Sequence, residues 1–329
     1  MSDAQLATIS PKDRTTENLA SAGAVGAVRD ANFSIYRGEV FVVMGLSGSG
    51  KSTLLRCLTR LIEPSAGQVT IADRDLMAAD EKTLVDIRRK NIGMVFQHFA
   101  LLPNRTVSSN IAFPLEVQGI RREEADRKVQ QLIDLVGLTG RENRYPAQLS
   151  GGQQQRIGIA RSLATDPDFW LLDEPFSALD PLIRSDLQDE LLRLQKTLAK
   201  TVVFITHDLD EAIRIADRVA IMENGRIIQI GTPEELVTAP ATDYVRRFVA
   251  KVPPANVVRV SSIMDPAVEE AGFAEGTVTL SADSTIQEIA PRLMQADKSF
   301  PVADDNGKLI GSLDAMKALA VLTRPGGDM

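Results

Sequence analysis

The stretch that decides the fold reads Gly45-Leu46-Ser47-Gly48-Ser49-Gly50-Lys51-Ser52-Thr53, and it fits the pattern G-x-x-x-x-G-K-[ST]. The run before it, residues 40–44, is apolar and mostly β-branched, which predicts a buried strand. After it, leucine and isoleucine recur at helical spacing as far as residue 62. Because the pattern needs a strand before it and a helix after it, we predict a phosphate-binding loop over residues 45–53, called the phosphate loop below.

The residue types of the phosphate loop explain how it would bind its ligand. Glycines let main-chain N–H groups approach phosphate oxygens without a Cβ between them. These donors lie at the start of a helix, where the helix dipole favours an anion. Lys51 would place a positive charge at the outer phosphates, and the Ser52 hydroxyl would ligate a magnesium ion. The alternative is a glycine-rich turn that precedes a helix by chance, which the lysine and the hydroxyl at the required positions disfavour.

Composition describes a globular protein with one large domain and one small one. The chain has 329 residues, of which 44% are hydrophobic and 25% charged. Its net charge of −7 argues against a broad nucleic-acid-binding surface. The single cysteine, Cys57, excludes an internal disulfide and a CxxC metal pair, which fits a reducing compartment.

The sequence offers no membrane anchor of its own. No apolar run approaches the roughly 20 residues that span a bilayer, and the N-terminus lacks the basic start and apolar core of a signal peptide. We therefore expect a cytoplasmic protein whose membrane association comes through a partner.

Two carboxylates and a histidine follow two further predicted strands. Residues 169–172 are apolar and lead into Asp173 and Glu174, and residues 201–205 lead into His207. In an open α/β sheet, ligands bind at the carboxyl ends of the strands. Asp173 would hold the magnesium ion, directly or through water, Glu174 would polarise an attacking water, and His207 would contact the terminal phosphate. The alternatives are an acidic turn into solvent and a structural histidine, which the phosphate loop upstream disfavours.

Three more features complete the set of motifs. A predicted strand over residues 92–96 ends at Gln97, which would face the nucleotide, although a glutamine in a solvated loop would look the same. Helical periodicity over about 98–140 predicts a helical insert. It is followed by the LSGGQ segment, a second potential anion site at a helix start, and later by the SALD loop, which opens a long amphipathic helix. The LSGGQ segment comprises Leu149, Ser150, Gly151, Gly152 and Gln153, and the SALD loop comprises Ser177, Ala178, Leu179 and Asp180.

The ordered set of motifs closely resembles the ATP-binding cassette (ABC) ATPases over roughly residues 22–250. The resemblance implies an α/β fold of the P-loop NTPase class, with a RecA-like core, an antiparallel β subdomain and a helical subdomain. It also implies ATP and Mg²⁺ as ligands, and hydrolysis of ATP to ADP and phosphate coupled to transport of a solute.

The resemblance assigns further roles to residues of this sequence. Gln97 would contact magnesium and the attacking water, Asp180 would act in signalling across a dimer, and His207 would contact the γ-phosphate. The LSGGQ segment would act across the dimer interface on ATP held by the phosphate loop of the other chain. One chain carries one copy of each half, so two complete sites require a homodimer.

Flanking sequence narrows the family. The segments 44–53, 60–64, 176–184 and 241–245 resemble the ATPase subunits of glycine betaine, proline and choline importers. The resemblance implies a separate integral membrane permease, a periplasmic or extracellular substrate-binding protein, and a peripheral position on the cytoplasmic face of the inner (plasma) membrane. It implies quaternary amines such as glycine betaine, choline or proline betaine as the transported solute. Another small solute, such as an amino acid, stays open as an alternative.

One position departs from the family. Many cassette ATPases stack adenine on an aromatic residue upstream of the phosphate loop, whereas the corresponding region near Ala22 is small and aliphatic. We therefore expect nucleotide affinity to rest mainly on phosphate contacts and discrimination between ATP and GTP to be weak. A competition assay tests this expectation.

The C-terminal part resembles one CBS repeat, in which a turn at Asp305-Asn306-Gly307 joins two apolar runs as a hairpin. Such repeats normally pair, so we expect pairing between the two chains of a dimer. The segment would sense ionic strength or a nucleotide, or it would only help dimerisation. We expect truncation after about residue 255 to leave ATPase activity but to alter its salt dependence.

The sequence predicts four successive parts of the chain. They are a loose extension over 1–20, the ABC domain over 21–250 with its helical subdomain over about 98–160, a linker over 251–260, and a small α+β CBS-like domain over 261–329.

Two other classes of function fit the sequence less well. Cassette proteins of DNA repair or translation usually carry two cassettes or a long coiled-coil insertion, together with basic surface. This chain has one cassette and a net charge of −7. A ligand sensor with a degenerate ATPase is disfavoured by intact Lys51, Asp173, Glu174 and His207.

Overall fold

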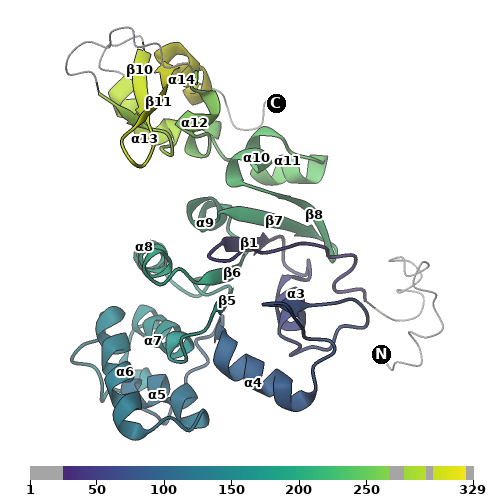
Figure 1. The fold of residues 1–329 in the computed structure, drawn as a ribbon, viewed down its shortest axis with the longest axis vertical. Coiled ribbons are helices and arrows are strands. Elements are labelled where there is room, and N and C mark those ends of the chain that lie inside the picture. Colours follow the sequence, from purple (N-terminus) through teal and green to yellow (C-terminus); the bar gives the residue numbers. More distant parts are fainter. Residues whose placement is uncertain (1–24, 267–277, 294–298, 324–329) are drawn as a thin grey trace, which may run out of the picture. The chain divides into compact units, whose positions relative to one another are not determined.

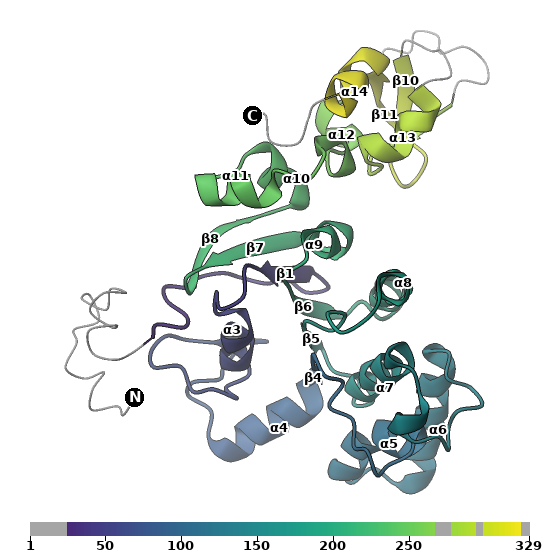
Figure 2. The same ribbon diagram turned by 180° about the vertical axis from the view of Figure 1, so that it is seen from behind.

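The computed structural model describes residues 25–266, 278–293 and 299–323 (Figures 1 and 2). The predicted extension over residues 1–20 and the departure near Ala22 lie outside these residues. Contacts divide the chain into a unit over residues 1–227 and a unit over residues 228–329.

The first unit is built around a parallel sheet, in which the strands follow the order β4-β5-β6-β1-β7, and β8 begins at the end of this unit. The pairs β4–β5, β5–β6, β6–β1 and β1–β7 are all parallel. The predicted buried strands before the phosphate loop, the carboxylates and the histidine are confirmed. The bounds of the strands are β1 Val40–Met44, β4 Ile92–Val95, β5 Phe169–Asp173, β6 Thr201–Thr206, β7 Arg218–Glu223 and β8 Arg226–Gly231.

The central strands are apolar on both faces because helices cover both faces of a parallel sheet. Every residue of β1 and of β6 is buried. Between and beside the strands run the helices α3 Lys51–Leu58, α4 Glu81–Asn91, α5 Val107–Val117, α6 Arg122–Leu135, α7 Gly151–Leu163, α8 Pro181–Leu198 and α9 Leu209–Ile215, with a 3₁₀ turn η2 at Pro146–Gln148.

The parallel order fixes where the predicted motifs meet. The carboxyl ends of parallel strands lie at one edge of the sheet, so the segments that follow β4, β5, β6 and β1 are neighbours there. These segments contain Gln97, Glu174, His207 and the phosphate loop. The prediction that the motifs share one edge of the sheet is confirmed for the strands that carry them.

The predicted helical insert is also present. Helices α5, α6 and α7 lie together, away from the sheet edge where α3 begins (Figure 1). The periodic stripe that predicted α6 is buried as a set, and it comprises Val129, Leu132, Ile133 and Val136.

The segment before β1 differs from the sequence-based expectation. Residues 22–39 mix small apolar residues with Phe33 and Ile35, which predicts edge strands, but the described part of this segment, residues 25–39, contains no strand. The backbone is instead bonded to a distant turn, since the Arg29 N–H donates to the Gly225 carbonyl at 2.7 Å, and it then turns at Tyr36 to Glu39. Between α3 and α4 in the chain, β2 Thr70–Ile71 and β3 Arg74–Asp75 pair as a short antiparallel hairpin.

The second unit contains a small three-stranded sheet in the order β11-β10-β9. The predicted hairpin is confirmed, because β10 pairs antiparallel with β11 and Asp304 accepts bonds from the N–H groups of Asn306 and Lys308 in the turn. The elements are α10 Pro233–Thr238, α11 Asp243–Val249, η3 Pro254–Asn256, α12 Val260–Ile263, β9 Leu280–Ser281, α13 Ile286–Leu293, β10 Ser299–Ala303, β11 Leu309–Asp314 and α14 Ala315–Leu322.

The predicted linker over residues 251–260 lies inside this second unit. It includes η3 and the start of α12, and its apolar side chains Val252, Ala255 and Val258 are buried. Burial of these side chains makes the segment a packed part of the unit rather than an exposed connection. The predicted domain ranges otherwise stay a prediction.

Candidate functional site

The phosphate loop turns tightly between β1 and α3 because glycine occupies its last bend. Gly50 caps α3 with φ of 102°, a left-handed conformation that side chains disfavour. A Cβ on Gly50 would lie only 2.1 Å from the carbonyl oxygen of Ala27. Both the backbone angle and the close approach therefore require glycine at this position.

Lys51 is buried at the start of α3, with 5% of its side chain exposed. Its ammonium donates to the carbonyl oxygens of Gly45 at 2.8 Å and of Leu46 at 3.2 Å, and it lies 3.9 Å from Oε1 of Glu174. Burial lowers the pKa of Lys51, while the carboxylates of Glu174 and Asp173 oppose that shift. The lysine charge is therefore held over the phosphate loop and against the predicted base.

Ser52 and Asp173 form an oxygen pair beside this lysine. The Ser52 hydroxyl donates to Oδ1 of Asp173 at 2.9 Å, and Asp173 is the buried last residue of β5. Burial raises the pKa of Asp173, and the bond from Ser52 opposes the rise. A hydroxyl and a carboxylate are oxygen donors of the kind that Mg²⁺ prefers, so this pair fits a magnesium ion bound together with phosphate oxygens.

Glu174 stands at the turn that leaves β5. Its backbone has φ of 45°, a left-handed conformation that is uncommon for a residue other than glycine, and its N–H donates to the Ile205 carbonyl of the neighbouring strand at 3.0 Å. Its Oε2 lies 3.1 Å from Nδ1 of His207. The turn thus points the Glu174 carboxylate between Lys51 and His207.

Gln97 follows β4 at the same sheet edge and is exposed. Within the described residues, its side chain makes no hydrogen bond to the motifs it was predicted to join. The structure places Gln97 on the correct strand end, and its predicted contacts with magnesium and water stay a prediction.

The LSGGQ segment forms the start of α7. Ser150 accepts from the Gln153 N–H at 3.3 Å, and Gln153 Oε1 accepts from the Ser150 N–H at 3.1 Å, so the two form a capping box. The glycines permit close packing on the SALD loop and on α8. A Cβ on Gly151 would lie 3.3 Å from Leu179, and one on Gly152 would lie 2.6 Å from Ile183.

The LSGGQ segment and the phosphate loop of the same chain are far apart in the fold. No hydrogen bond or ion pair joins them within the first unit's described residues, and α7 and α3 lie on opposite sides of β5 in Figures 1 and 2. The two predicted anion-binding segments are therefore separate within a single chain.

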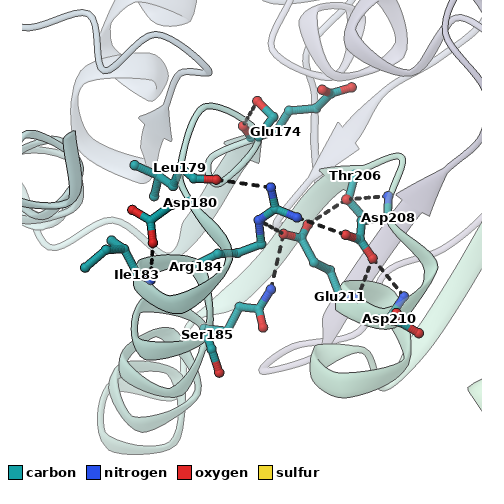
Figure 3. Close-up of polar contacts among 12 residues, drawn as sticks. Glu174, Leu179, Asp180, Ile183, Arg184, Ser185, Thr206, Asp208, Asp210 and Glu211 are labelled. Atoms are coloured by element: carbon teal, nitrogen blue, oxygen red, sulfur yellow. Dashed lines mark hydrogen bonds and ion pairs between the residues drawn. The ribbon is translucent and has the colours of Figure 1, made fainter.

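A polar cluster that the sequence analysis missed connects the SALD loop with Asp208, the residue after His207 (Figure 3). Its centre is Arg184, which contacts the Leu179 carbonyl and the carboxylates of Asp208 and Glu211. Asp208 and Glu211 lie more than twenty positions away in sequence. Only the adjacency of α8 and α9 brings these groups together, so no local pattern could have predicted it.

Comparison with known proteins decides the family. The chain is 50% identical over 298 residues to the trimethylamine N-oxide transport system ATP-binding protein TmoW of Pelagibacter ubique, a match that covers 90% of this chain and 86% of that protein. The chain belongs to the ATP-binding proteins of ABC transporters. The TmoW protein of Ruegeria pomeroyi is 47% identical over 319 residues, which is 97% of this chain and 92% of that protein.

Two family models and the similar solved structures agree with the assignment of this chain to the ABC transporter family. The ABC transporter model matches residues 28–177, and the CBS domain model matches residues 260–322. Among solved structures, the dimeric post-hydrolysis state of the ATP-binding cassette MJ0796, bound to ADP and Pi, is 36% identical with a TM-score of 0.58 and covers 63% of this chain and 90% of that chain. The predicted ABC ATPase fold and the CBS-like segment are thereby confirmed.

Within the described residues of the ABC protein, no helix combines the length and the apolar character needed to cross a membrane.

Proposed function

We propose that this ABC ATPase hydrolyses ATP at the edge of the sheet formed by β1, β5 and β6, and so energises uptake of a quaternary amine or related methylamine through a separate membrane permease. The observation that carries the proposal is the position of Glu174, whose carboxylate lies within reach of both Lys51 and His207. Beside it, the Ser52 and Asp173 oxygens form a pair at 2.9 Å.

Substrate binding rests on the phosphate loop. Main-chain N–H groups of residues 45–53 and the N-terminus of α3 would hold the β- and γ-phosphates, and the Lys51 ammonium would exchange its carbonyl contacts for phosphate oxygens. Ser52 and Asp173, with Gln97, would hold Mg²⁺, which neutralises charge on the phosphates when bound. The site then works mainly by positioning and charge stabilisation.

Glu174 serves as the general base in this proposal. A carboxylate at this position can orient and polarise a water for attack on the γ-phosphate. His207, bonded to Glu174 through Nδ1, would contact the γ-phosphate and keep the carboxylate aimed at the water. Gln97 would orient the same water from the end of β4. Variants of Glu174 and His207 are expected to bind ATP and to hydrolyse it slowly.

The complete site needs a second copy of the chain. The LSGGQ segment is separated from the phosphate loop within one chain, and the similar solved cassette MJ0796 is described as dimeric with ADP and Pi bound. In a homodimer, the LSGGQ segment of each chain would close on ATP held by the partner's phosphate loop. Asp180 would take part in signalling between the two chains across the interface. Closure on two ATP and reopening after hydrolysis would then drive the permease.

The transported solute is proposed from the relatives. Two relatives that match this chain over most of both lengths are named for trimethylamine N-oxide transport. The glycine betaine/proline betaine system protein ProV of Salmonella typhimurium is 39% identical, with 92% of this chain and 89% of that protein covered. Trimethylamine N-oxide and glycine betaine both carry a nitrogen bearing three methyl groups, so the class is a small methylated amine. An ATP-binding protein for another small solute is the alternative.

A transport measurement tests the solute assignment. The chain would be purified from detergent-solubilised membranes with its permease, placed in vesicles together with the co-purifying substrate-binding protein, and offered labelled trimethylamine N-oxide, glycine betaine, choline or methionine. The proposal expects ATP-dependent uptake of one or more of the methylated amines, abolished by Glu174→Gln. Uptake of methionine alone would reject the assignment in favour of an amino-acid importer. Before detergent is added, the same membranes test the proposed peripheral position on the cytoplasmic face, because a peripheral protein sediments with them and is accessible to protease from that face.

The CBS-like part is proposed to regulate transport or to assist dimerisation. Its role is tested by the salt dependence of ATPase activity in reconstituted vesicles. Truncation after about residue 255 cuts inside the second unit and would expose residues that pack there. As a control, the first unit, residues 1–227, must melt at the same temperature in the truncated chain as in the full-length chain. An altered salt profile supports regulation, whereas an unchanged profile with weaker dimerisation supports a dimer contact only.

A further inference from the structure

Arg184 connects the SALD loop, which follows Glu174 in the chain, with Asp208 (Figure 3). It lies in the first turn of α8. Its Nη2 donates to the Leu179 carbonyl in the SALD loop at 3.2 Å. Its Nη1 donates to Oδ2 of Asp208, the residue directly after His207, at 3.2 Å. One guanidinium therefore spans from the loop that follows Glu174 to the residue that follows His207.

The groups that receive these bonds are themselves fixed. Asp208 caps α9 by accepting from the N–H groups of Asp210 and Glu211, and its own N–H donates to the Thr206 hydroxyl at 2.9 Å. Arg184 is therefore bonded to a residue that is itself fixed in the turn between β6 and α9, and this turn carries His207.

A buried carboxylate lies beneath the same guanidinium. Glu211 is 6% exposed and lies 3.8 Å from Nε of Arg184. It accepts bonds from the Thr206 hydroxyl at 2.6 Å and from the Gln188 amide at 3.2 Å. Burial raises the pKa of Glu211, and the positive charge of Arg184 opposes that rise. The planar, forked guanidinium can face a carbonyl and two carboxylates at once, which a lysine ammonium cannot do equally well.

We propose that Arg184 is a positioning residue for ATP hydrolysis, which holds the His207 turn and the SALD loop in the register that brings His207 to Glu174. The proposal rests on the roles proposed for Glu174 and His207. Arg184 does not touch the reacting groups. It acts through Asp208 and the Leu179 carbonyl.

The chain offers a matched control at Arg214. Its Nη1 donates to Ser185 and to Gln188, both at 3.0 Å, and its Nη2 pairs with Asp189 at 2.6 Å. Arg214 therefore joins α9 to the same helix α8 as Arg184 does, but it contacts neither the SALD loop nor Asp208. Loss of a general helix contact should affect Arg214→Gln and Arg184→Gln alike, whereas loss of positioning should affect only the latter.

The test measures ATPase kcat and KM, with melting temperatures, for Arg184→Gln, Arg184→Lys, Asp208→Asn and Arg214→Gln in the full-length chain. Asparagine caps a helix as well as aspartate does, so Asp208→Asn removes the charge pair and keeps the α9 cap. We expect Arg184→Gln to lower kcat by roughly 10–100-fold, the range for a displaced catalytic group, with KM for ATP unchanged. Arg184→Lys should recover part of the loss, and Arg214→Gln should keep the wild-type kcat.

The double variants separate positioning from simple destabilisation. Arg184→Gln combined with Asp208→Asn should be no slower than the slower single variant, because both break one contact. In a His207→Ala chain, Arg184→Gln should cause no further loss. Equal losses in the wild-type and His207→Ala backgrounds, or equal losses for Arg184→Gln and Arg214→Gln, would overturn the proposal.

Failure of the site assignment would look different. Undiminished hydrolysis by Glu174→Gln and His207→Ala in the same assay would reject the site itself, whatever Arg184 does. If Arg184→Gln does not fold, Arg184→Lys and Asp208→Asn carry the test, since each keeps either a charge or a cap in place. Wild-type kcat for both of these variants would then overturn the positioning role.

Discussion

Nδ1 of His207 lies 3.1 Å from Oε2 of Glu174, although 33 positions separate the two residues in sequence. The contact follows from the pairing of β5 with β6, in which Asp173 lies opposite Ile205. The residues just beyond the two strand ends therefore meet. The left-handed turn at Glu174 then directs its carboxylate toward the histidine and Lys51. The base and the phosphate contact proposed for this site thus come from neighbouring strands.

Replacement of Lys51 by methionine should remove the charge that faces the outer phosphates. We expect turnover to fall by roughly 10²–10³-fold, the range for loss of one preorganised electrostatic group, and ATP affinity to fall as well. Binding of a fluorescent ATP analogue and steady-state hydrolysis measure the two effects. Lys200→Met is the control, because Lys200 forms its ion pair with the exposed Asp166, outside the proposed site. Equal effects of the two substitutions would contradict the role of Lys51.

Loss of the Ser52 hydroxyl should act through magnesium. In Ser52→Ala, the donor to Asp173 at 2.9 Å disappears, and one proposed oxygen ligand disappears with it. We expect the Mg²⁺ concentration for half-maximal activity to rise by roughly 10–100-fold, as for weakened metal sites. Ser52→Thr keeps a hydroxyl and should retain most of the Mg²⁺ affinity. An unchanged Mg²⁺ dependence in Ser52→Ala would exclude the hydroxyl as a ligand.

Asp173→Asn should stabilise the fold at neutral pH while it abolishes hydrolysis. Burial raises the pKa of Asp173 in the native state, so the native chain holds this proton at a pH where the unfolded chain has released it. The stabilisation from this group is therefore present below its unfolded pKa and is lost as pH rises through its folded pKa. Asparagine avoids the buried charge and can still accept from Ser52.

The check is a series of thermal melts against pH. The melting temperature of Asp173→Asn should exceed that of the wild type at neutral pH, and the difference should shrink as the pH falls through the range in which Asp173 binds its proton. A lower melting temperature for Asp173→Asn at neutral pH would show that the Asp173 charge is net stabilising, which is the opposite of the expected effect of its burial.

Two alanine substitutions in the phosphate loop should differ sharply. Gly48 has φ of 80° and open space where a Cβ would lie, so Gly48→Ala should lower the free energy of unfolding by about 1–3 kcal/mol, the usual range for such strain. Gly50→Ala adds a clash with the Ala27 carbonyl at 2.1 Å. It should therefore destabilise the fold more and displace the loop. Equal denaturant midpoints for the two variants would contradict the predicted clash.

Much of the site could be predicted from sequence because its parts are local. The phosphate loop, the two carboxylates and His207 each follow an apolar run that reads as a strand, and parallel strands bring their carboxyl ends to one edge. The capping box of Ser150 and Gln153 is likewise a short-range pattern. Local patterns of this kind depend on neighbours within a few residues, so they can be recognised without knowledge of the fold.

Other features depend on which elements become neighbours. Residues 25–39 form no strand, and the Arg29 N–H within them donates to the carbonyl of the distant Gly225. Arg184 meets Asp208 only because α8 packs beside α9. The requirement for glycine at position 50 comes partly from Ala27, which lies before β1. Nothing near these residues in the sequence signals such long-range contacts.

The turnover of Glu174→Gln tests the central claim most directly. Glutamine keeps the size of the side chain and removes the proposed base. We expect kcat to fall by roughly 10²–10⁴-fold, the range for a general acid–base group, with ATP still bound and the ATP-bound dimer accumulating in size-exclusion chromatography with Mg²⁺. Hydrolysis at the wild-type rate by this variant would contradict the assignment of Glu174 and, with it, the site described at this edge of the sheet.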